Sequence, residues 1–547
     1  MKTHIRKAGV LLHPTSFPSN HGIGDLGKEA YHFIDFLAAA NQSLWQILPT
    51  GPTGFGDSPY QSFSAFAGNT LLISPDLLAD QGLLLPKELT NNLSRDHVDF
   101  GHVVNYKKHL HQLAYKRFKP NKAYQAFCEA NQAWLPDYCL FMAIKNHLIE
   151  ERRLAGETAS YLAYAKKFAK YMTAEEIDDH FYGAVWNSWP EELANRDKKA
   201  LAAYQKLLKP AIDCEKFLQY QFFTQWEKLK AYANLNGVSI IGDIPIFVSI
   251  DSADVWVHKA LFYLDRDNIP TVVAGVPPDY FSADGQLWGN PLYDWEQHQA
   301  EDFAWWIARM KATLKTVDII RLDHFRGFES YWAVKYGEKT AKTGKWCKGI
   351  GADLFLALQD ELVGAGRLPQ LPIIAEDLGL ITPEVEKLRD SLGLPGMKIL
   401  QFAFGDDFKN LYLPHNYEGN NCVVYTGTHD NDTTISWYHQ ANDKEQDKVR
   451  RYLNINGSYI NEELIRLAYA SNAMWAIVPL QDILGQGGDS RMNTPGVRTG
   501  NWQYRYHDGA LNEDIIKKLL YLVMMFNRGG EEPVEENDKE NAGAISH

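Results

Sequence analysis

Short runs of apolar residues recur along the chain, separated by polar stretches and by segments with helical periodicity. Eight of these runs predict β-strands, at residues 9–14, 44–48, 238–246, 317–323, 372–376, 397–402, 422–425 and 473–479. Helical patterns lie between most of them, for example at 28–40, 354–362 and 383–392. Eight strands, each followed by a helix or a long loop, predict an α/β protein with a (β/α)8 TIM barrel.

The alternation of strands and helices is interrupted by one long helical region. From about residue 74 to residue 237 the pattern is mainly helical, which predicts a large insertion between the second and third strands. We therefore expect a catalytic barrel over residues 8–528, with long loops at its catalytic face. Residues 529–547 are rich in Glu, Asn and Gly, which is typical of a disordered acidic tail.

Composition narrows the class of protein. The 547 residues are 45% hydrophobic and 22% charged, the balance of an ordinary globular protein. The net charge of -13 argues against a nucleic-acid partner, because phosphate binding requires a basic surface. No apolar stretch approaches the ~20 residues of a membrane span. The five widely spaced cysteines are typical of free thiols in a reducing compartment, so we expect a cytoplasmic protein without a membrane partner.

Two further features concern possible ligands. Aromatic residues make up 13% of the chain, and without a basic patch beside them they favour sugars over nucleobases as stacking partners. Residues 22–27 spell G-x-G-x-x-G, but two prolines separate these glycines from the first strand. No acid follows at the end of the second strand, so a dinucleotide site is not expected here.

Residues 317–327 join a strand to a cluster of charges. Side chains alternate along a strand, so Ile319, Arg321 and Asp323 are expected on one face. A buried arginine two residues before an aspartate is costly unless the two charges pair. Arg321 would then lower the pKa of Asp323 and hold it ionised, as a carboxylate nucleophile requires.

Other acids occupy corresponding positions, at the carboxyl ends of different predicted strands, where barrel active sites lie. They are Asp243, Glu376 with Asp377, and Asp430 with Asp432. Such a cluster fits either a glycosidase pair or a divalent-metal site of the enolase type. Positive charge beside Asp323, from Arg321, His324 and Arg326, favours the glycosidase pair, and no metal or other cofactor is expected.

Several stretches, taken together and in order, resemble glycoside hydrolase family 77, the amylomaltases or 4-α-glucanotransferases. The similarity extends over roughly residues 8–506. The matching stretches are Leu12–Ser16, Gly56–Gln61, Pro277–Phe281, Gly285–Pro291, Arg321–Gly327, Ala375–Gly379, Thr428–Thr433 and Asn493–Gly496.

The resemblance implies roles for individual residues. Asp323 is expected to be the nucleophile, Glu376 the general acid/base and Asp430 the third carboxylate, which holds the distorted sugar. Asp243 is expected to support the site. Tyr60 and Trp288 are expected in Gly-, Pro- and Asp-rich loops, where they would form walls of a sugar groove. The full set of expected substrate contacts is Tyr60, Asp279, Phe281, Gln286, Trp288, Arg321, His429 and Asn493.

The family implies a retaining transfer of α-1,4-glucan segments from malto-oligosaccharides or glucans to the 4-hydroxyl of glucose or of another glucan. Pattern alone does not separate transfer from hydrolysis, which depends on whether an acceptor sugar outcompetes water. An α-glucan hydrolase of the amylase type therefore remains an alternative. A glucan-binding protein with an inactive site and a metal-dependent barrel enzyme are more distant alternatives.

Overall fold

The computed structural model describes residues 6–278, 282–366, 370–405, 407–497 and 499–529. Asp279, Phe281 and the predicted tail from residue 530 onward lie outside these ranges. The eight predicted strands are present, and each lies within a few residues of its expected position. They are β1 (Lys7–Leu11), β2 (Leu44–Gln46), β3 (Ser239–Pro245), β6 (Ile319–Asp323), β9 (Ile373–Ala375), β10 (Gly396–Ile399), β11 (Cys422–Tyr425) and β12 (Trp475–Pro479).

These strands form a parallel barrel. Their order is β10-β11-β12-β1-β2-β3-β6-β9, and every neighbouring pair is parallel. The strands at the two ends of this order, β9 and β10, also meet. The N–H of Ala375 in β9 donates to the carbonyl of Pro395, just before β10, at 2.9 Å. The predicted TIM barrel is therefore confirmed. Parallel strands direct all their carboxyl ends to one face, which is where the predicted acids lie.

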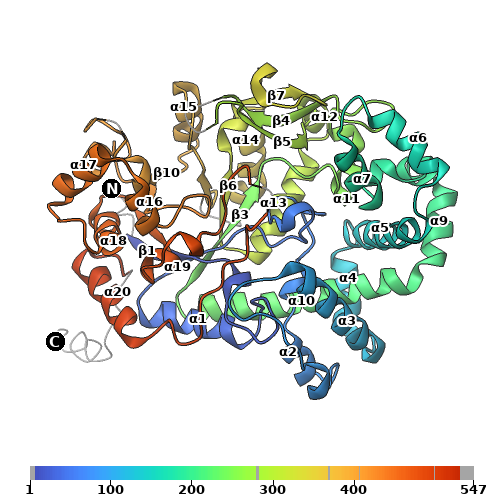
Figure 1. The fold of residues 1–547 in the computed structure, drawn as a ribbon, viewed down its shortest axis with the longest axis horizontal. Helices are drawn as coiled ribbons and strands as arrows, with labels where there is room; N and C mark the ends of the chain where they lie inside the picture. Colours follow the sequence, from blue (N-terminus) through green and yellow to red (C-terminus); the bar gives the residue numbers. More distant parts are fainter. Residues whose placement is uncertain (1–5, 279–281, 367–369, 406, 498, 530–547) are drawn as a thin grey trace, which may run out of the picture.

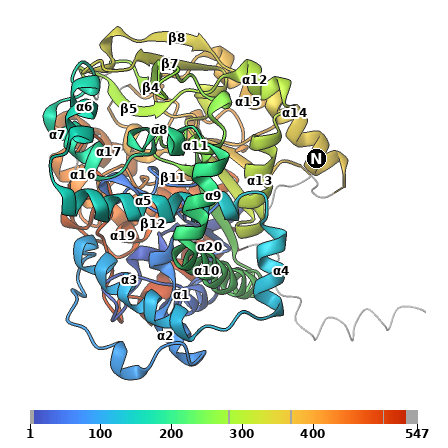
Figure 2. The same ribbon diagram turned by 90° about the vertical axis from the view of Figure 1, so that its right-hand side faces the viewer.

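A second sheet lies above the barrel in Figure 2 and was not predicted. It consists of β4 (Val272–Val276), β5 (Gln286–Pro291), β7 (Ser330–Lys335) and β8 (Lys345–Lys348). The strands are antiparallel in the order β5-β4-β7-β8. Placing Trp288 in an irregular loop was therefore wrong, because it lies in β5. These strands are short, β5 contains a glycine and a proline, and β8 has a lysine at each end, so the four strands share no clear apolar period.

The region between β2 and β3 is helical, as predicted. It lies on the opposite side of the barrel from α16 (Thr434–Gln440), α17 (Asp443–Leu453), α18 (Ile460–Ala470) and α20 (Glu513–Met525) (Figure 1). Its last helix packs on the barrel itself. The Trp226 ring lies 6.4 Å from that of Trp45 in β2, and its Nε1 donates to the Thr316 carbonyl at 2.7 Å. The helices of this region are α2 (Pro75–Asp80), α3 (Phe100–Arg117), α4 (Lys122–Ala130), α5 (Leu135–Ala155), α6 (Ala159–Phe168), α7 (Ala174–Tyr182), α8 (Glu191–Ala194), α9 (Lys198–Leu207) and α10 (Lys209–Leu235).

The remaining helices alternate with the barrel strands. The predicted helix at 354–362 is α14 followed by a π-helical turn, Asp360–Gly364. Among the helices that the structure describes, none is long and apolar enough to cross a membrane. These helices are α1 (Lys28–Ala39), α11 (Ala253–Val257), α12 (Trp295–Ala300), α13 (Ala304–Thr316), α14 (Asp353–Gln359), α15 (Pro383–Ser391), α16 (Thr434–Gln440), α17 (Asp443–Leu453), α18 (Ile460–Ala470), α19 (Leu480–Ile483) and α20 (Glu513–Met525).

The glycine-rich loop at 22–27 packs against its own chain. A Cβ atom added to Gly24 would lie 2.0 Å from the carbonyl oxygen of Pro14, so the glycine allows two backbone segments to meet. Gly27 is the N-cap of α1, and a Cβ there would lie 2.6 Å from the Ser74 hydroxyl. The motif thus has a packing explanation.

Candidate active site

The end of β6 carries the centre of the site. Asp243 on β3 and Arg321 on β6 are partners in the strand register. Nη1 of Arg321 donates to Oδ2 of Asp243 at 2.6 Å and to Oδ1 of Asp323 at 2.9 Å. Arg321 is only 4% exposed, so the two carboxylates balance a buried charge. The expected pairing of Arg321 with Asp323 is present, and Asp243 is a second partner.

Asp243 is a buried carboxylate that contacts two other residues of the site. Burial and the nearby Asp323 carboxylate together raise the pKa of Asp243 to about 7, and Arg321 opposes this increase. The Tyr60 hydroxyl donates to the same Asp243 oxygen at 2.8 Å. Burial, together with the Asp243 charge, holds the pKa of Tyr60 well above its ordinary value, so the phenol remains a donor. Asp243 thereby fixes both Arg321 and Tyr60.

Glu376 follows β9 and lies close to Asp323. Its Oε2 accepts a hydrogen bond from the His324 N–H at 2.7 Å, and its Oε1 accepts one from the Leu378 N–H at 3.0 Å. The residue is 9% exposed. Burial, and secondly the negative charge of Asp323, raise the pKa of Glu376 to about 8. Glu376 therefore keeps its proton near neutral pH, as a general acid must.

Asp430 lies on the loop that follows β11. The Asn493 amide donates to its Oδ1 at 2.6 Å, and Nε2 of His429 lies 3.3 Å from the same oxygen. The imidazole of His429 stacks on the ring of Tyr60, with 5.2 Å between the ring centroids. The Asp430 side chain is 47% exposed, so its carboxylate is accessible to a ligand. Burial lowers the pKa of His429, which favours the neutral imidazole.

The structure thus brings several predicted residues to one place. The charges of Asp323 and Asp430 lie close enough to Tyr60 to raise its pKa. Those of Arg321 and Asp323 influence the pKa of His429 in opposite directions. Trp288 reaches the same region from β5, where its ring meets His324 edge-on at a centroid distance of 4.8 Å. Oε1 of Gln286 accepts from the Trp288 indole N–H at 3.2 Å. Asp279 and Phe281, the other expected contacts, lie outside the described residues.

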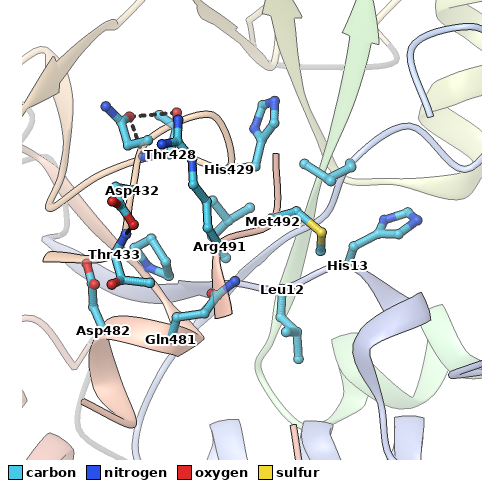
Figure 3. A pocket seen from close by; sticks show the side chains of 14 residues that line it. Leu12, His13, Thr428, His429, Asp432, Thr433, Gln481, Asp482, Arg491 and Met492 are labelled. Carbon is cyan, nitrogen blue, oxygen red and sulfur yellow. Dashed lines mark hydrogen bonds between the residues drawn. The ribbon is translucent and has the colours of Figure 1, made fainter. Parts of the chain in front are cut away.

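A small pocket lies beside His429, between the ends of β1, β11 and β12 (Figure 3). Its volume is about 20 Å³. Arg491 projects through it: Nη2 donates to the Asp430 carbonyl at 2.6 Å, and Nε donates to the Asn493 carbonyl at 2.8 Å. The Asn493 N–H in turn donates to the His429 carbonyl at 3.1 Å. The loop after β12 therefore holds the loop that carries Asp430.

Two residues that build this site, Arg491 and His324, were not predicted from the sequence. Arg491 had no motif of its own, although it lies only two positions before Asn493. His324 was noted only for its charge, whereas its backbone N–H binds Glu376 and its pKa is lowered to about 3 by burial. Within the part of the chain that the structure describes, no three His, Cys, Asp or Glu side chains are grouped so as to hold a metal ion.

Comparison with known proteins identifies related chains. The model of the glycoside hydrolase 77 family, described as "4-alpha-glucanotransferase", matches residues 12–512. A 4-alpha-glucanotransferase from Synechocystis sp. is 47% identical over 533 residues, 96% of this chain and 98% of that protein. One from Thermus thermophilus is 44% identical, over 93% and 96% of the two chains. The structure of amylomaltase from Streptococcus agalactiae in complex with acarbose superposes with a TM-score of 0.86. That protein is 38% identical, and the match covers 96% of this chain and all of the other.

Proposed function

This chain belongs to glycoside hydrolase family 77, the 4-α-glucanotransferases, and we propose that it moves α-1,4-glucan segments between sugars by double displacement through a covalent intermediate. Family membership carries the coarser statement that the chain is a 4-α-glucanotransferase enzyme acting on α-1,4-glucans. The finer proposal is that malto-oligosaccharides or glucans are donors. The 4-hydroxyl of glucose or of another glucan is the acceptor.

In the first half of the reaction, Asp323 attacks the anomeric carbon of the donor sugar. Glu376 gives its proton to the glycosidic oxygen, the bond between that oxygen and the anomeric carbon breaks, and the shortened glucan leaves with a free 4-hydroxyl. The product is a glycosyl ester of Asp323, and Glu376 is left as a carboxylate.

In the second half, a new sugar takes the place of the leaving glucan. Glu376 accepts the proton of its 4-hydroxyl while that oxygen attacks the anomeric carbon, and the ester bond to Asp323 breaks. Two successive inversions retain the α configuration. Asp323 regains its charge beside Arg321, and Glu376 regains its proton, so the site returns to its starting state.

The remaining contacts are proposed to hold the sugars. Asp430, oriented by Asn493 and His429, binds hydroxyls of the reacting sugar and holds it in a distorted conformation. Tyr60 and Trp288 form walls of the groove, because aromatic rings provide flat apolar faces for sugars. Gln286 adjoins Trp288. Asp279 and Phe281 are, by family resemblance, further contacts to the sugar.

One observation carries this proposal. Glu376 is buried beside Asp323 and has a pKa raised to about 8, whereas Asp323 shares a hydrogen bond with the buried Arg321. The two carboxylates therefore sit in opposite electrostatic environments. One holds a proton and the other lies against a cation, which is the division of labour that retaining glycosidic chemistry requires.

The test is incubation of the purified protein with maltotriose in the presence of a chelator, with products separated by chain length over time. Glucose together with a ladder of longer oligomers, at a constant number of reducing ends, is the expected result. The ladder should disappear in Asp323→Asn. Glucose and maltose alone, with a rising number of reducing ends, would instead identify an α-glucan hydrolase and contradict the proposal.

A further inference from the structure

His324 follows directly after the proposed nucleophile and has a left-handed backbone conformation, with φ 51° and ψ 48°. Residues with a Cβ atom seldom adopt this conformation, because Cβ approaches the following carbonyl. The residue begins the 3-10 turn Phe325–Phe328 at the end of β6. The left-handed turn is thus located between Asp323 and the next element of the chain.

This turn directs backbone donors toward Glu376. The His324 N–H donates to Oε2 of Glu376 at 2.7 Å, and the Phe325 N–H donates to the Glu376 carbonyl at 3.0 Å. On the other side of Asp323, the Leu322 carbonyl accepts from the Glu376 N–H at 3.1 Å. Three hydrogen bonds therefore join residues 322, 324 and 325 to residue 376, on both sides of Asp323.

The imidazole of His324 packs against neighbouring residues. Its ring meets Trp288 edge-on, at an interplanar angle of 85°. Gly327 is a further neighbour of the ring: a Cβ added there would be 3.2 Å from Cδ2 of the imidazole and 2.8 Å from Cδ1 of Ile246. A side chain at position 327 would press on both the imidazole and Ile246, so glycine there leaves room for the ring beside the turn.

We propose that His324 is a positioning residue whose left-handed backbone fixes the Glu376 carboxylate relative to Asp323. The inference rests on the proposed function, since it assumes that these two acids are the nucleophile and the acid/base. Double displacement uses both carboxylates at one anomeric centre in both half-reactions, so their separation must be kept throughout. The backbone N–H of His324, the residue next to the nucleophile, maintains this separation by its hydrogen bond to Glu376.

The hydrogen bond also has an electrostatic effect that can be measured. The His324 N–H favours the ionised form of Glu376 and therefore lowers its pKa, against burial and the charge of Asp323. The other groups that act on or near Glu376 are Arg321 on β6, Asp377 next to it in the chain, and Tyr412 after β10. Loss of the N–H bond would raise the pKa of Glu376 further and shift the alkaline limb of activity to higher pH.

The test compares substitutions that tolerate or resist the left-handed conformation. His324→Asn and His324→Gly accept it, His324→Ala resists it, and His324→Val resists it most. Transfer activity on maltotriose would be measured from about pH 5 to pH 9, with thermal unfolding used to normalise for folded protein. We expect His324→Asn and His324→Gly to keep most of kcat. In His324→Val, kcat should fall on the order of a hundredfold, because small misplacements of catalytic groups have effects of this size.

The pH profile separates positioning from a general loss of structure. The alkaline limb of His324→Val should move to higher pH, with that of His324→Ala in between. If His324→Val does not fold, His324→Ala alone provides the comparison. Tyr459→Val is the matched control, because Tyr459 has the same left-handed backbone (φ 54°) at the start of α18 and is 74% exposed. It should lose stability but keep its kcat and pH profile.

Two results would overturn the inference. Equal losses in all four variants would assign the effect to the imidazole rather than to the backbone, and full activity in all four would show that the turn does not matter. Failure of the proposed function looks different: Glu376→Gln or Asp323→Asn would then remain active, whatever the order of the His324 variants.

Discussion

Replacing Glu376 with glutamine should change the stability of the folded protein in a way that depends on pH. Glu376 is 9% exposed and accepts backbone hydrogen bonds from His324 and Leu378. Burial, and then the charge of Asp323, raise its pKa from an ordinary value of 4.5 to about 8. Between pH 4.5 and about 8, the folded protein therefore holds a proton at Glu376 that the unfolded chain has already released.

The size of the effect follows from this difference in proton binding. A carboxyl whose pKa is raised on folding leaves stability intact below its unfolded pKa and lowers it as the pH rises toward its folded pKa. Between pH 4.5 and about 8, the free energy of unfolding should fall by about 1.4 kcal/mol per pH unit, roughly 4–5 kcal/mol in all. Glutamine removes this slope. Its NH2 group would face one of the two backbone N–H donors, at a pH-independent cost of about 1–3 kcal/mol.

Glu376→Gln is therefore expected to be less stable than the parent protein at about pH 5 and more stable at about pH 8. Urea titrations at several pH values would give the free energy of unfolding of both proteins. Asp430→Asn is the matched control, since it removes a negative charge from the same site but from a side chain that is 47% exposed. A stability difference for Glu376→Gln that stays constant across this pH range would refute the reasoning.

Three further predictions follow from the contacts of the site. Tyr60→Phe removes the 2.8 Å hydrogen bond to Asp243 but keeps the ring, so the free energy of unfolding, measured by thermal unfolding, should fall by about 1 kcal/mol. An unchanged free energy of unfolding would show that this bond does not stabilise the protein. Asn493→Ala removes the 2.6 Å donor to Asp430, and kcat/KM on maltotriose should fall about tenfold; unchanged initial rates would argue against it. A chelator should leave activity unchanged, because Arg321 supplies the positive charge at the centre of the site, and inactivation reversed by added metal would revive a metal-dependent mechanism.

The barrel was predictable because its strands are buried and therefore apolar. The run at 422–425 coincides with β11, all four residues of which are buried. The second sheet was not predictable by the same signal. Its strands include Gly275 and Pro291 and are held by cross-strand contacts, such as that between Trp332 and Trp346, whose rings lie 5.2 Å apart. Such pairs are visible only once the strands are aligned.

The acids of the site were predictable as a group because a barrel brings the carboxyl ends of its strands to one face. Their partners were less accessible. Arg491 binds the Asp430 carbonyl across 61 positions of sequence, and nothing local to Arg491 indicates that contact. The role of His324 depends on a left-handed backbone, which no residue pattern around it specifies. The individual roles of the acids came from family resemblance, and the assignment of each role stays a prediction, as does the cytoplasmic location.

The most direct test of the proposed chemistry is to trap the covalent intermediate. In Glu376→Gln, an α-maltosyl fluoride donor needs no proton to release fluoride, so Asp323 can still attack, while the second half-reaction lacks its base. Mass spectrometry of the intact protein and of its peptides would then locate the bound sugar. We predict one glycosyl group, attached to the peptide that carries Asp323. A glycosyl group on a different acid, or none in a variant that still consumes the fluoride, would contradict the assignment of Asp323 as nucleophile.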